Sequence, residues 1–191
     1  MNKETEIELQ AKLKHSKPLL DFLEREAQFE SENHQVDEYF TPAHRNFLSP
    51  RPIEEWFRLR DSNGKYSVNY KRWHFDKEGR GLYADEFETK IESIDTMRKI
   101  LENLNFKPVT VVDKKRKIWR YRDYEIAMDS VKNLGDFVEI EYYGDRHHAD
   151  HKEIMNEMIA FLKNLGCGTL EVNHAGYPAL LLGRGERIDK I

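Results

Sequence analysis

Charged residues recur in pairs separated by one residue, and both members of each pair carry the same sign. Three pairs are acidic and three are basic: Glu6/Glu8, Glu86/Glu88, Glu139/Glu141, Arg58/Arg60, Lys114/Arg116 and Arg120/Arg122. Side chains at positions i and i+2 lie on the same face of a β-strand, so each pair would present two like charges to one side. Carboxylates bind divalent cations such as Mg²⁺, and basic side chains bind phosphate oxygens. The pattern therefore suggests a site for a metal ion and a polyphosphate.

The simplest interpretation of any one pair is the solvated face of an ordinary strand, because charged residues are mostly exposed. Like charges along one strand face repel, however, and exposed faces usually intersperse the two signs. The six pairs together favour a closed sheet whose charged face points inward. A cavity of this kind needs an occupant, because unpaired buried charge is very costly. A polyanion bound with divalent cations would neutralise both sets of charges.

Composition argues against several other classes of protein. The chain has 191 residues, of which 39 % are hydrophobic and 12 % aromatic, enough for one packed domain over residues 1–191. The net charge of −4, from 31 Lys+Arg against 35 Asp+Glu, argues against a nucleic-acid partner. No apolar run approaches the roughly 20 residues that span a bilayer, and charges occur throughout the start of the chain. We therefore expect no membrane partner and a cytoplasmic location.

We assign no catalytic or metal-binding role to the single cysteine or to a cluster of histidines. Cys167 is the only cysteine, which excludes an internal disulfide and a multi-cysteine metal site. His147, His148 and His151 could bind Zn²⁺, but short His-rich tracts are unspecific, and we interpret them as the polar start of a helix. The sequence also lacks the Gly-x-x-x-x-Gly-Lys-Ser/Thr motif, so phosphate binding would not use a P-loop.

The elements that position these charges begin with a strand. Apolar and polar residues alternate over 4–13, as in a strand with one apolar face. A helix is expected to begin near Ser16, with Phe29 among its apolar residues. Asn63-Gly64 predicts a hairpin, because both residues tolerate positive φ. Around it we expect extended chain over 35–40, a loop over 43–52, and strands over 55–60 and 65–72.

The second half of the chain alternates strands with two helices. Strands are expected over 85–91, 109–121, 124–128 and 136–142. Apolar spacing predicts helices over 93–105 and 150–165, the second capped by Asp150 with Glu153 and ended by Gly166. Many strands joined by turns, with three helices, indicate one α+β domain built on a large antiparallel sheet or barrel.

Several short motifs follow one another in a specific order. They are Glu6-Ile7-Glu8, Arg60, Lys71, Lys114-x-Arg116 and the run from Asp129 to Glu141. In this order and spacing, the chain resembles the CYTH superfamily, the triphosphate tunnel metalloenzymes. The segments 134–139 (Leu-Gly-Asp-Phe-Val-Glu) and 177–183 (Tyr-Pro-Ala-Leu-Leu-Leu-Gly) are most similar to its class IV adenylyl cyclase branch. Each motif is weak alone, but together they cover the chain from Glu6 to Gly183.

The resemblance implies a fold and a set of roles. The fold class would be α+β, an eight-stranded antiparallel β-barrel or tunnel with helices packed outside. One or two Mg²⁺ or Mn²⁺ ions would be held by Glu6, Glu8, Glu139 and Glu141. The triphosphate would be gripped by Arg58, Arg60, Lys71, Lys114 and Arg116. Asp129 would sit near the reacting end, where Lys114 and Arg116 would also take part in catalysis.

One position departs from the family pattern. The opening motif of the family is Glu-x-Glu-x-Lys, and this sequence has Gln10 at the lysine position. Glutamine can donate hydrogen bonds to a substrate but brings no positive charge. Lys12 is expected to point to the same strand face, about 7 Å further along, and to substitute in part. Both residues are therefore placed in the predicted substrate site.

The implied reaction is that of a class IV adenylyl cyclase. The ribose 3′-hydroxyl of ATP would attack the α-phosphorus and give cyclic AMP and pyrophosphate. A triphosphatase, in which water attacks the terminal phosphorus in the same tunnel, is an open alternative. A non-catalytic nucleotide or polyphosphate sensor is another, because Gln10 weakens the match to the enzymes. The expected partner is ATP or another triphosphate, and a homodimer is left open.

Overall fold

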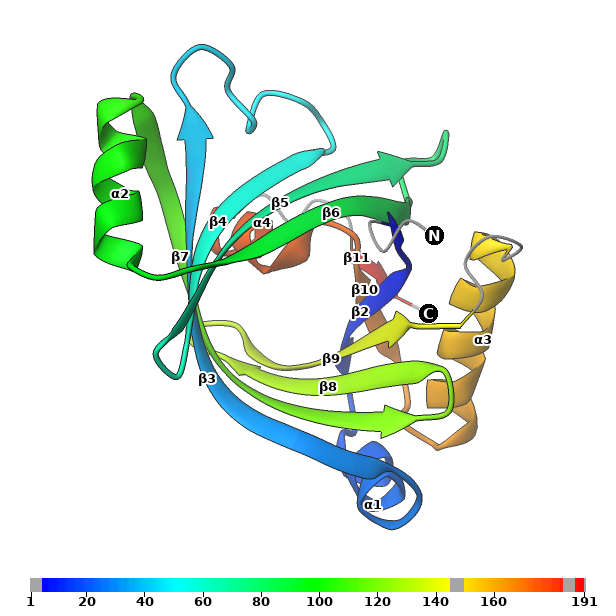
Figure 1. Cartoon of the computed structure of the whole chain (residues 1–191). Coiled ribbons are helices and arrows are strands. Elements are labelled where there is room, and N and C mark those ends of the chain that lie inside the picture. Colours follow the sequence, from blue (N-terminus) through cyan, green and yellow to red (C-terminus); the bar gives the residue numbers. More distant parts are fainter. Residues whose placement is uncertain (1–4, 145–149, 184–187, 191) are drawn as a thin grey trace.

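The computed structural model describes residues 5–144, 150–183 and 188–190. In these residues one antiparallel sheet runs in the order β1-β6-β5-β4-β3-β7-β8-β9-β2-β10-β11 (Figure 1). The strands are β1 (Thr5–Glu6), β2 (Glu8–Leu13), β3 (Gln28–Pro42), β4 (Glu55–Ser62), β5 (Lys65–Phe75), β6 (Gly81–Ile91), β7 (Phe106–Tyr121), β8 (Tyr124–Val131), β9 (Gly135–Tyr142), β10 (Leu170–Asn173) and β11 (Ile188–Lys190). The helices are α1 (Lys17–Glu26), α2 (Ile94–Asn103), α3 (His151–Asn164) and α4 (Gly176–Leu181).

The hydrogen-bonded strand order does not close the sheet into a ring. The ring is closed because one continuous segment of chain, β1 with β2, pairs with β6 and then with β9. β1 and β2 are one extended segment interrupted at Ile7, where β1 pairs with β6 and β2 pairs with β9. The amide of Tyr142 donates to the carbonyl of Ile7 at 3.0 Å beside this interruption. With this segment taken as one strand, β3 to β9 complete an eight-stranded tunnel. The predicted α+β tunnel is therefore confirmed.

Side-chain alternation explains why the charged face points inward. The apolar residues between the charges, such as Leu9 and Ile140, point outward and pack against Leu23 of α1 and Met158 of α3. All four are fully buried, and burying a large apolar side chain stabilises a fold by about 1.5–3 kcal/mol. A one-residue slip of β2 would exchange these apolar residues with the carboxylates. The core outside the tunnel therefore fixes which strand face lines it.

The N-terminal helix is shorter than its apolar residues predict. α1 ends at Glu26, and Ala27 already has extended backbone. Phe29 therefore belongs to β3, where its ring packs edge-on against Trp119 and 52 % of the residue stays exposed. The prediction that Phe29 belongs to the helix is wrong, because apolar spacing cannot separate a helix from a strand that follows it directly.

Asp150 as the N-cap of α3 and Gly166 at its end are confirmed as predicted. The Asp150 side chain accepts hydrogen bonds from the amides of Lys152 and Glu153 at 2.9 and 3.2 Å. Gly166 follows the helix with φ +83°, a conformation that glycine adopts without strain. His147 and His148 lie outside the described residues. No helix in the described ranges has the length and apolar character needed to span a membrane.

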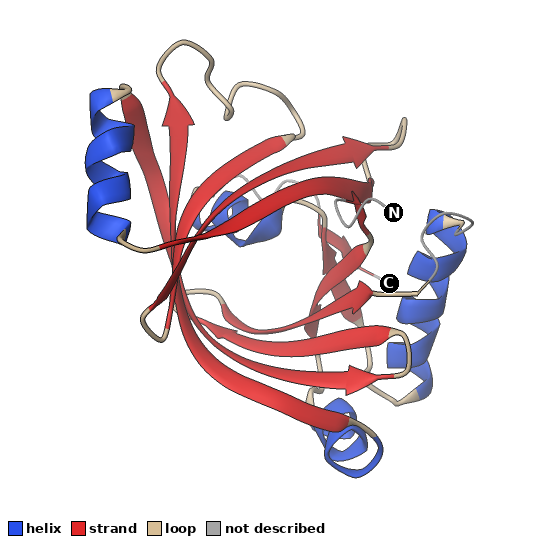
Figure 2. Ribbon diagram, in the orientation of Figure 1, coloured by secondary structure: helices blue, strands red, loops and turns tan. Residues whose placement is uncertain are grey.

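Three short elements near the C-terminus, β10, α4 and β11, were not predicted from the sequence. α4 has six residues and includes Pro178, so it is too short to give an apolar periodicity. Figure 2 shows α1, α2 and α3 outside the ring of strands, whereas α4 lies across the far end of its opening. Gly176, Tyr177 and Pro178 line the interior there, so α4 closes one end of the tunnel.

Candidate active site

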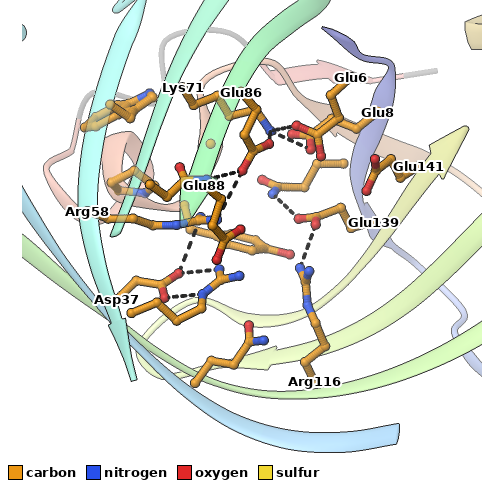
Figure 3. Close-up of a pocket in the computed structure, with 18 of the residues that line it drawn as sticks. Glu6, Glu8, Asp37, Arg58, Lys71, Glu86, Glu88, Arg116, Glu139 and Glu141 are labelled. Carbon is orange, nitrogen blue, oxygen red and sulfur yellow. Dashed lines mark hydrogen bonds and ion pairs between the residues drawn. The ribbon is translucent and has the colours of Figure 1, made fainter. Parts of the chain in front are cut away.

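The tunnel encloses a cavity of about 900 Å³ whose wall carries both signs of charge (Figure 3). Its carboxylates are Glu6, Glu8, Asp37, Glu86, Glu88, Glu125, Glu139 and Glu141. Its basic side chains are Arg58, Arg60, Lys71, Lys114 and Arg116. The structure therefore brings charged pairs that are remote in sequence into one space. Because acids outnumber bases, a bound polyanion would require additional cations.

Three of the carboxylates surround one ammonium group. The Nζ of Lys71 lies 2.5 Å from Glu6 Oε2, 2.8 Å from Glu8 Oε2 and 3.5 Å from Glu86 Oε2. Burial raises the pKa of Glu6 well above its usual range, with Lys71 opposing the rise and Glu8 adding to it. Burial acts on Glu86 too, but Lys71 and Arg58 outweigh it and lower the pKa of Glu86. Lys71 thus holds together carboxylates that would otherwise repel one another.

These carboxylates suit a divalent cation, although no three acidic, histidine or cysteine side chains in the described residues converge as a ready-made metal cage. Glu6 Oε2 is buried, and its close neighbour is the Lys71 ammonium at 2.5 Å. Mg²⁺ is typically held by one or two carboxylates together with substrate phosphates. The donor set therefore fits such an ion, provided that Lys71 gives up its place among the carboxylates.

Glu139 lies on the neighbouring strand β9. Its Oε1 accepts from Arg116 Nη2 at 2.7 Å, and its Oε2 accepts from Gln10 Nε2 at 3.0 Å. Burial would raise the pKa of Glu139, but Arg116 above all lowers it well below its usual range. Across the β2–β9 ladder, Gln10 faces Glu139 and Glu8 faces Glu141. The structure thus brings the four predicted metal ligands to one side of the cavity (Figure 3).

β4 supplies two guanidinium groups that differ in how firmly they are held. Arg60 binds Asp37 through two bonds of 2.6 and 2.7 Å. Arg58 contacts Asp37 at 3.5 Å, the Tyr39 hydroxyl at 3.4 Å and Glu86 at 3.5 Å, all at the outer limit of hydrogen bonding. Although burial opposes it, Arg60 and Arg58 lower the pKa of Asp37 below its usual range. Arg60 is therefore already paired, whereas Arg58 keeps donors available for an anion.

Asp129 anchors two of the bases and does not face the cavity. Its side chain has 0 % exposure and is not part of the cavity wall. It accepts from Arg116 at 2.6 and 2.5 Å, from Lys114 at 3.1 Å and from the Tyr177 hydroxyl at 2.9 Å. The resemblance placed Asp129 near the reacting end; in the structure it lies behind the two bases and orients them. Burial, together with the charge of Arg116, lowers the pKa of Lys114 to about 8.

Two predicted positions on β2 have different surroundings. Gln10 lines the cavity as predicted, and its Oε1 accepts a hydrogen bond from Asn173 Nδ2. Lys12 is exposed and lies outside the cavity wall: its Nζ donates to the carbonyl of Leu134 at 3.0 Å and lies over the Phe137 ring. The structure therefore does not bring Lys12, the expected partial substitute for the family lysine, to the cavity wall, because β2 has left the cavity two residues after Gln10.

The pair Arg120 and Arg122 is also outside the cavity wall. Arg120 forms ion pairs with Glu30 and Glu125, at 3.4 and 3.0 Å. Arg122 occupies the β7–β8 turn with φ +53°, so the i, i+2 relation of a strand does not hold there. The spacing of the charges is the same in this pair as in the two basic pairs that line the cavity, so the sequence pattern does not distinguish them.

Sequence reasoning missed several residues of the site. Asp37, which pairs with Arg60, is 1 % exposed and sits in a run of polar residues on β3. Its only signal was the alternation of Gln35, Asp37 and Tyr39, which places all three on one strand face. Trp56 and Tyr177 also line the cavity. Aromatic residues carry no charge pattern, so nothing in their spacing marked them as part of a polar site.

An antiparallel sheet wrapped into a tunnel around facing carboxylates and basic side chains defines a class of protein, the triphosphate tunnel metalloenzymes. The CYTH domain family model matches residues 4–177, and the chain belongs to this family. Members of the family bind triphosphate substrates and use divalent metal ions. A relative from Methanocaldococcus jannaschii, named "Putative adenylate cyclase", is 33% identical over 177 residues, which span 92% of this chain and 97% of the relative.

Solved structures agree with the assignment of the fold. A protein from Pyrococcus horikoshii OT3 is 25% identical, with a TM-score of 0.77 over 94% of this chain and 99% of that one. A protein from Hippeastrum, named "Putative adenylyl cyclase" and described as having a dominant triphosphatase activity, is 18% identical. Its TM-score is 0.62 over 95% of this chain and 96% of that one. At that identity the likeness shows the fold alone.

Proposed function

We propose that the protein is a metal-dependent enzyme of the class IV adenylyl cyclase type, which converts ATP into cyclic AMP and pyrophosphate. The observation that carries the proposal is the cavity itself, in which carboxylates of β1, β2 and β9 face basic side chains of β4 and β7. The name of the archaeal relative supports the choice of reaction. As parts of the same proposal, the chain forms one domain and has neither a nucleic acid nor a membrane as partner.

The basic side chains would bind and neutralise the triphosphate. Arg58 and Lys114 line the cavity, and Asp129 orients Lys114 and Arg116 through buried ion pairs. In the reaction the ribose 3′-oxygen forms a bond to the α-phosphorus while the bond from that phosphorus to the pyrophosphate oxygen breaks, and the hydroxyl proton is released. Fixed positive charge stabilises the charge that develops on the departing pyrophosphate.

The acidic side of the cavity would hold the metal. We assign Glu6, Glu8 and Glu139 as ligands of Mg²⁺ or Mn²⁺, with Glu141 beside them. A bound ion would supply Lewis-acid stabilisation of charge on the phosphate oxygens. Lys71 is positioned to neutralise Glu6 and Glu8 when no ion is bound and to reach a phosphate when one is.

A triphosphatase is the second candidate, and the Hippeastrum protein favours it, because that protein combines this fold and a cyclase name with a dominant triphosphatase activity. Water would then attack the terminal phosphorus and release phosphate. A polyphosphate sensor remains the non-catalytic alternative, since Gln10 hydrogen-bonds Glu139 and supplies no charge to the substrate.

Incubation with ATP and Mn²⁺, followed by chromatography of the products, tests the proposal. Cyclic AMP with pyrophosphate supports the cyclase, ADP with phosphate supports the triphosphatase, and binding without turnover supports the sensor. A protein that neither binds nor converts ATP or tripolyphosphate contradicts all three. Glu139→Gln, assayed in parallel, shows whether any turnover belongs to this cavity.

A further inference from the structure

Glu139 is held by a chain of hydrogen bonds that begins outside the cavity. The backbone amide of Ala175 donates to Asn173 Oδ1 at 3.1 Å, and Asn173 Nδ2 donates to Gln10 Oε1. Gln10 Nε2 in turn donates to Glu139 Oε2 at 3.0 Å. Gln10 and Asn173 are only 7 % and 6 % exposed, so water competes little for these bonds. Each of the two amide side chains therefore uses both its oxygen and its nitrogen inside the protein.

The strand order sets the three side chains in a row. β2 lies between β9 and β10 in the sheet, and Gln10 faces Glu139 across the β2–β9 ladder. On the other side of β2, Val172 faces Ala11, so the next residue of β10, Asn173, lies beside Gln10. Gln10 lines the tunnel cavity, whereas Asn173 does not. Asn173 therefore reaches the cavity only through its hydrogen bond to Gln10.

The direction of every bond in this chain is fixed at its two ends. A backbone N–H can only donate, so the amide of Ala175 requires the oxygen of the Asn173 side chain. A guanidinium also can only donate, and Arg116 Nη2 lies 2.7 Å from Glu139 Oε1, so Glu139 accepts. Between these ends, Asn173 must donate to Gln10, and Gln10 must donate to Glu139. Turning over the amide of Gln10 would set its oxygen against a carboxylate oxygen and its nitrogen against another NH₂ group.

The Glu139 carboxylate is thus held at both oxygens. Arg116 donates to one oxygen and Gln10 to the other, which fixes the plane of the group. A carboxylate has about four lone-pair sites, so each oxygen keeps one for an ion. Loss of a hydrogen-bond partner of a ligating side chain typically lowers metal affinity. The orientation of Glu139 therefore depends on a residue that lies outside the cavity.

We propose that Asn173 is a positioning residue of the active site, which fixes the amide of Gln10 and, through it, the orientation of the Glu139 carboxylate toward a divalent cation. The inference rests on the proposed function, because it takes Glu139 as a metal ligand. It gives Gln10 a role that needs no charge, that of an oriented neutral donor.

The first test follows the side-chain NH₂ signals in ¹⁵N-correlated NMR spectra of the whole protein, titrated with Mg²⁺ alone. Gln10→Met and Asn173→Leu identify the two signals by their disappearance. In the wild type both should shift with one dissociation constant, because hydrogen bonds in a chain polarise one another. In Gln10→Met the Asn173 signal should no longer respond. Asn103, which donates to a backbone carbonyl on the exposed face of α2, should stay in place.

Calorimetry with Mn²⁺ alone gives the second readout. Asn173→Leu keeps a side chain of similar size and removes the donor without changing the charge, so the affinity should fall about ten-fold or more. Gln10→Met should weaken binding to a similar extent. In the Gln10→Met background, Asn173→Leu should cost less than about two-fold, because no amide is left to orient. Asn103→Leu is the matched control and should bind within about two-fold of the wild type.

The failures of the two proposals are distinguishable. If the wild type binds neither Mg²⁺ nor Mn²⁺, the proposed function fails and the inference with it. If the wild type binds while the Asn173 signal stays fixed and Asn173→Leu binds equally well, the positioning role is refuted and the function stands. An equal loss in the wild-type and Gln10→Met backgrounds also overturns the inference, because Asn173 then acts on the fold and not through Gln10. Should Asn173→Leu fail to fold, its signal can be assigned from the backbone, and the Mg²⁺ titrations of the wild type and Gln10→Met decide the matter.

Discussion

Glu139 accepts hydrogen bonds from a guanidinium and from a neutral amide, and the ion pair with the guanidinium needs its negative charge. Glu139→Gln keeps the shape but removes the charge that pairs with Arg116. We expect metal-dependent turnover to fall by at least about 10–100-fold, the loss typical of disturbed metal environments. Mn²⁺ titration and the ATP product assay measure it. Glu171→Gln, at a surface ion pair with Lys190, should change neither, and a Glu139→Gln protein with wild-type metal dependence would refute the ligand assignment.

Lys114 should make the binding of triphosphate depend on pH. Its pKa of about 8 means that the ammonium of the free protein loses its proton as the pH rises through that value. Metal-free tripolyphosphate should therefore bind progressively more weakly above about pH 8, as calorimetry at several pH values will show. Lys114→Arg stays charged and should bind with little change over the same range. If the affinity for tripolyphosphate changes with pH in the same way in the wild type and in Lys114→Arg, Lys114 does not contact the anion.

The same group has a predictable effect on stability. An unfolded lysine has a pKa near 10.4, so between about pH 8 and that value the unfolded chain binds more protons than the folded one. The free energy of unfolding contributed by Lys114 therefore rises with pH in this window. Urea unfolding at pH 8 and pH 10, compared between wild type and Lys114→Arg, isolates this contribution.

Gln10 gives a further test at the level of single residues. Lysine at this position would place an ammonium beside Glu139, in a partly desolvated site where a unit charge has a large effect. We expect Gln10→Lys to tighten tripolyphosphate binding and raise kcat/KM for ATP. Lys12→Gln is the matched control and should change the affinity less than about two-fold, because Lys12 lies outside the cavity wall. A clear fall in kcat/KM for Gln10→Lys would instead indicate a different substrate.

A buried hydrogen bond joins α4 to Asp129. The Tyr177 hydroxyl donates to Asp129 at 2.9 Å, and its ring packs edge-on against Phe137. Burial and the charge of Asp129 raise the pKa of Tyr177 well above its usual range, so the hydroxyl keeps its proton and donates. Since Asp129 also holds Lys114 and Arg116, this one bond ties α4 to the basic wall of the cavity.

Tyr177→Phe should therefore lower both stability and affinity. Removing a hydrogen bond to a buried carboxylate costs about 1–3 kcal/mol, so urea unfolding should show a loss of this size. Tripolyphosphate should bind more weakly, because Asp129 holds the two bases less firmly. Tyr124→Phe removes a hydroxyl that donates to Glu157 at the surface and should cost less than about 0.5 kcal/mol. Equal losses in the two variants would contradict the anchoring role.

The long strands could be predicted from the sequence, whereas the short elements near the C-terminus could not. The alternation over 4–13 and the Asn63-Gly64 turn mark β2, β4 and β5 correctly, because they depend on local preferences. α4 and β10 contain six and four residues, too few for any period to show. The break at Ile7 is equally invisible in the sequence, since it arises where one strand passes from β6 to β9.

For the whole molecule, the excess of carboxylates over bases in the cavity couples the two ligands. Metal ions alone relieve repulsion among Glu6, Glu8 and Glu86, whereas a triphosphate alone adds negative charge to an acidic cavity. Mn²⁺ and tripolyphosphate together should therefore raise the unfolding temperature by more than the sum of their separate effects. Saturation at about 100 times Kd stabilises a protein by about 2.7 kcal/mol, large enough for a thermal unfolding matrix to resolve. If the two shifts in unfolding temperature simply add, the metal ion and the triphosphate do not share a site. The surface variant Glu171→Gln is the control, and a loss of the extra stabilisation in that variant alone would also contradict a shared site.

The sequence by itself determined that most of the like-charge pairs share strand faces, and with its motifs it indicated the tunnel fold and the family. It could do so because alternation along a strand is a local property, set by the backbone and by the outward burial of residues such as Leu9 and Ile140. Only the tertiary structure decided which charges meet. It placed Asp129 behind Lys114 and Arg116 and put Lys12 outside the cavity, because those outcomes depend on strand register and on where α4 packs. Some of these contacts join residues more than a hundred positions apart, as Lys12 with Leu134 and Gln10 with Glu139, and no local pattern encodes them.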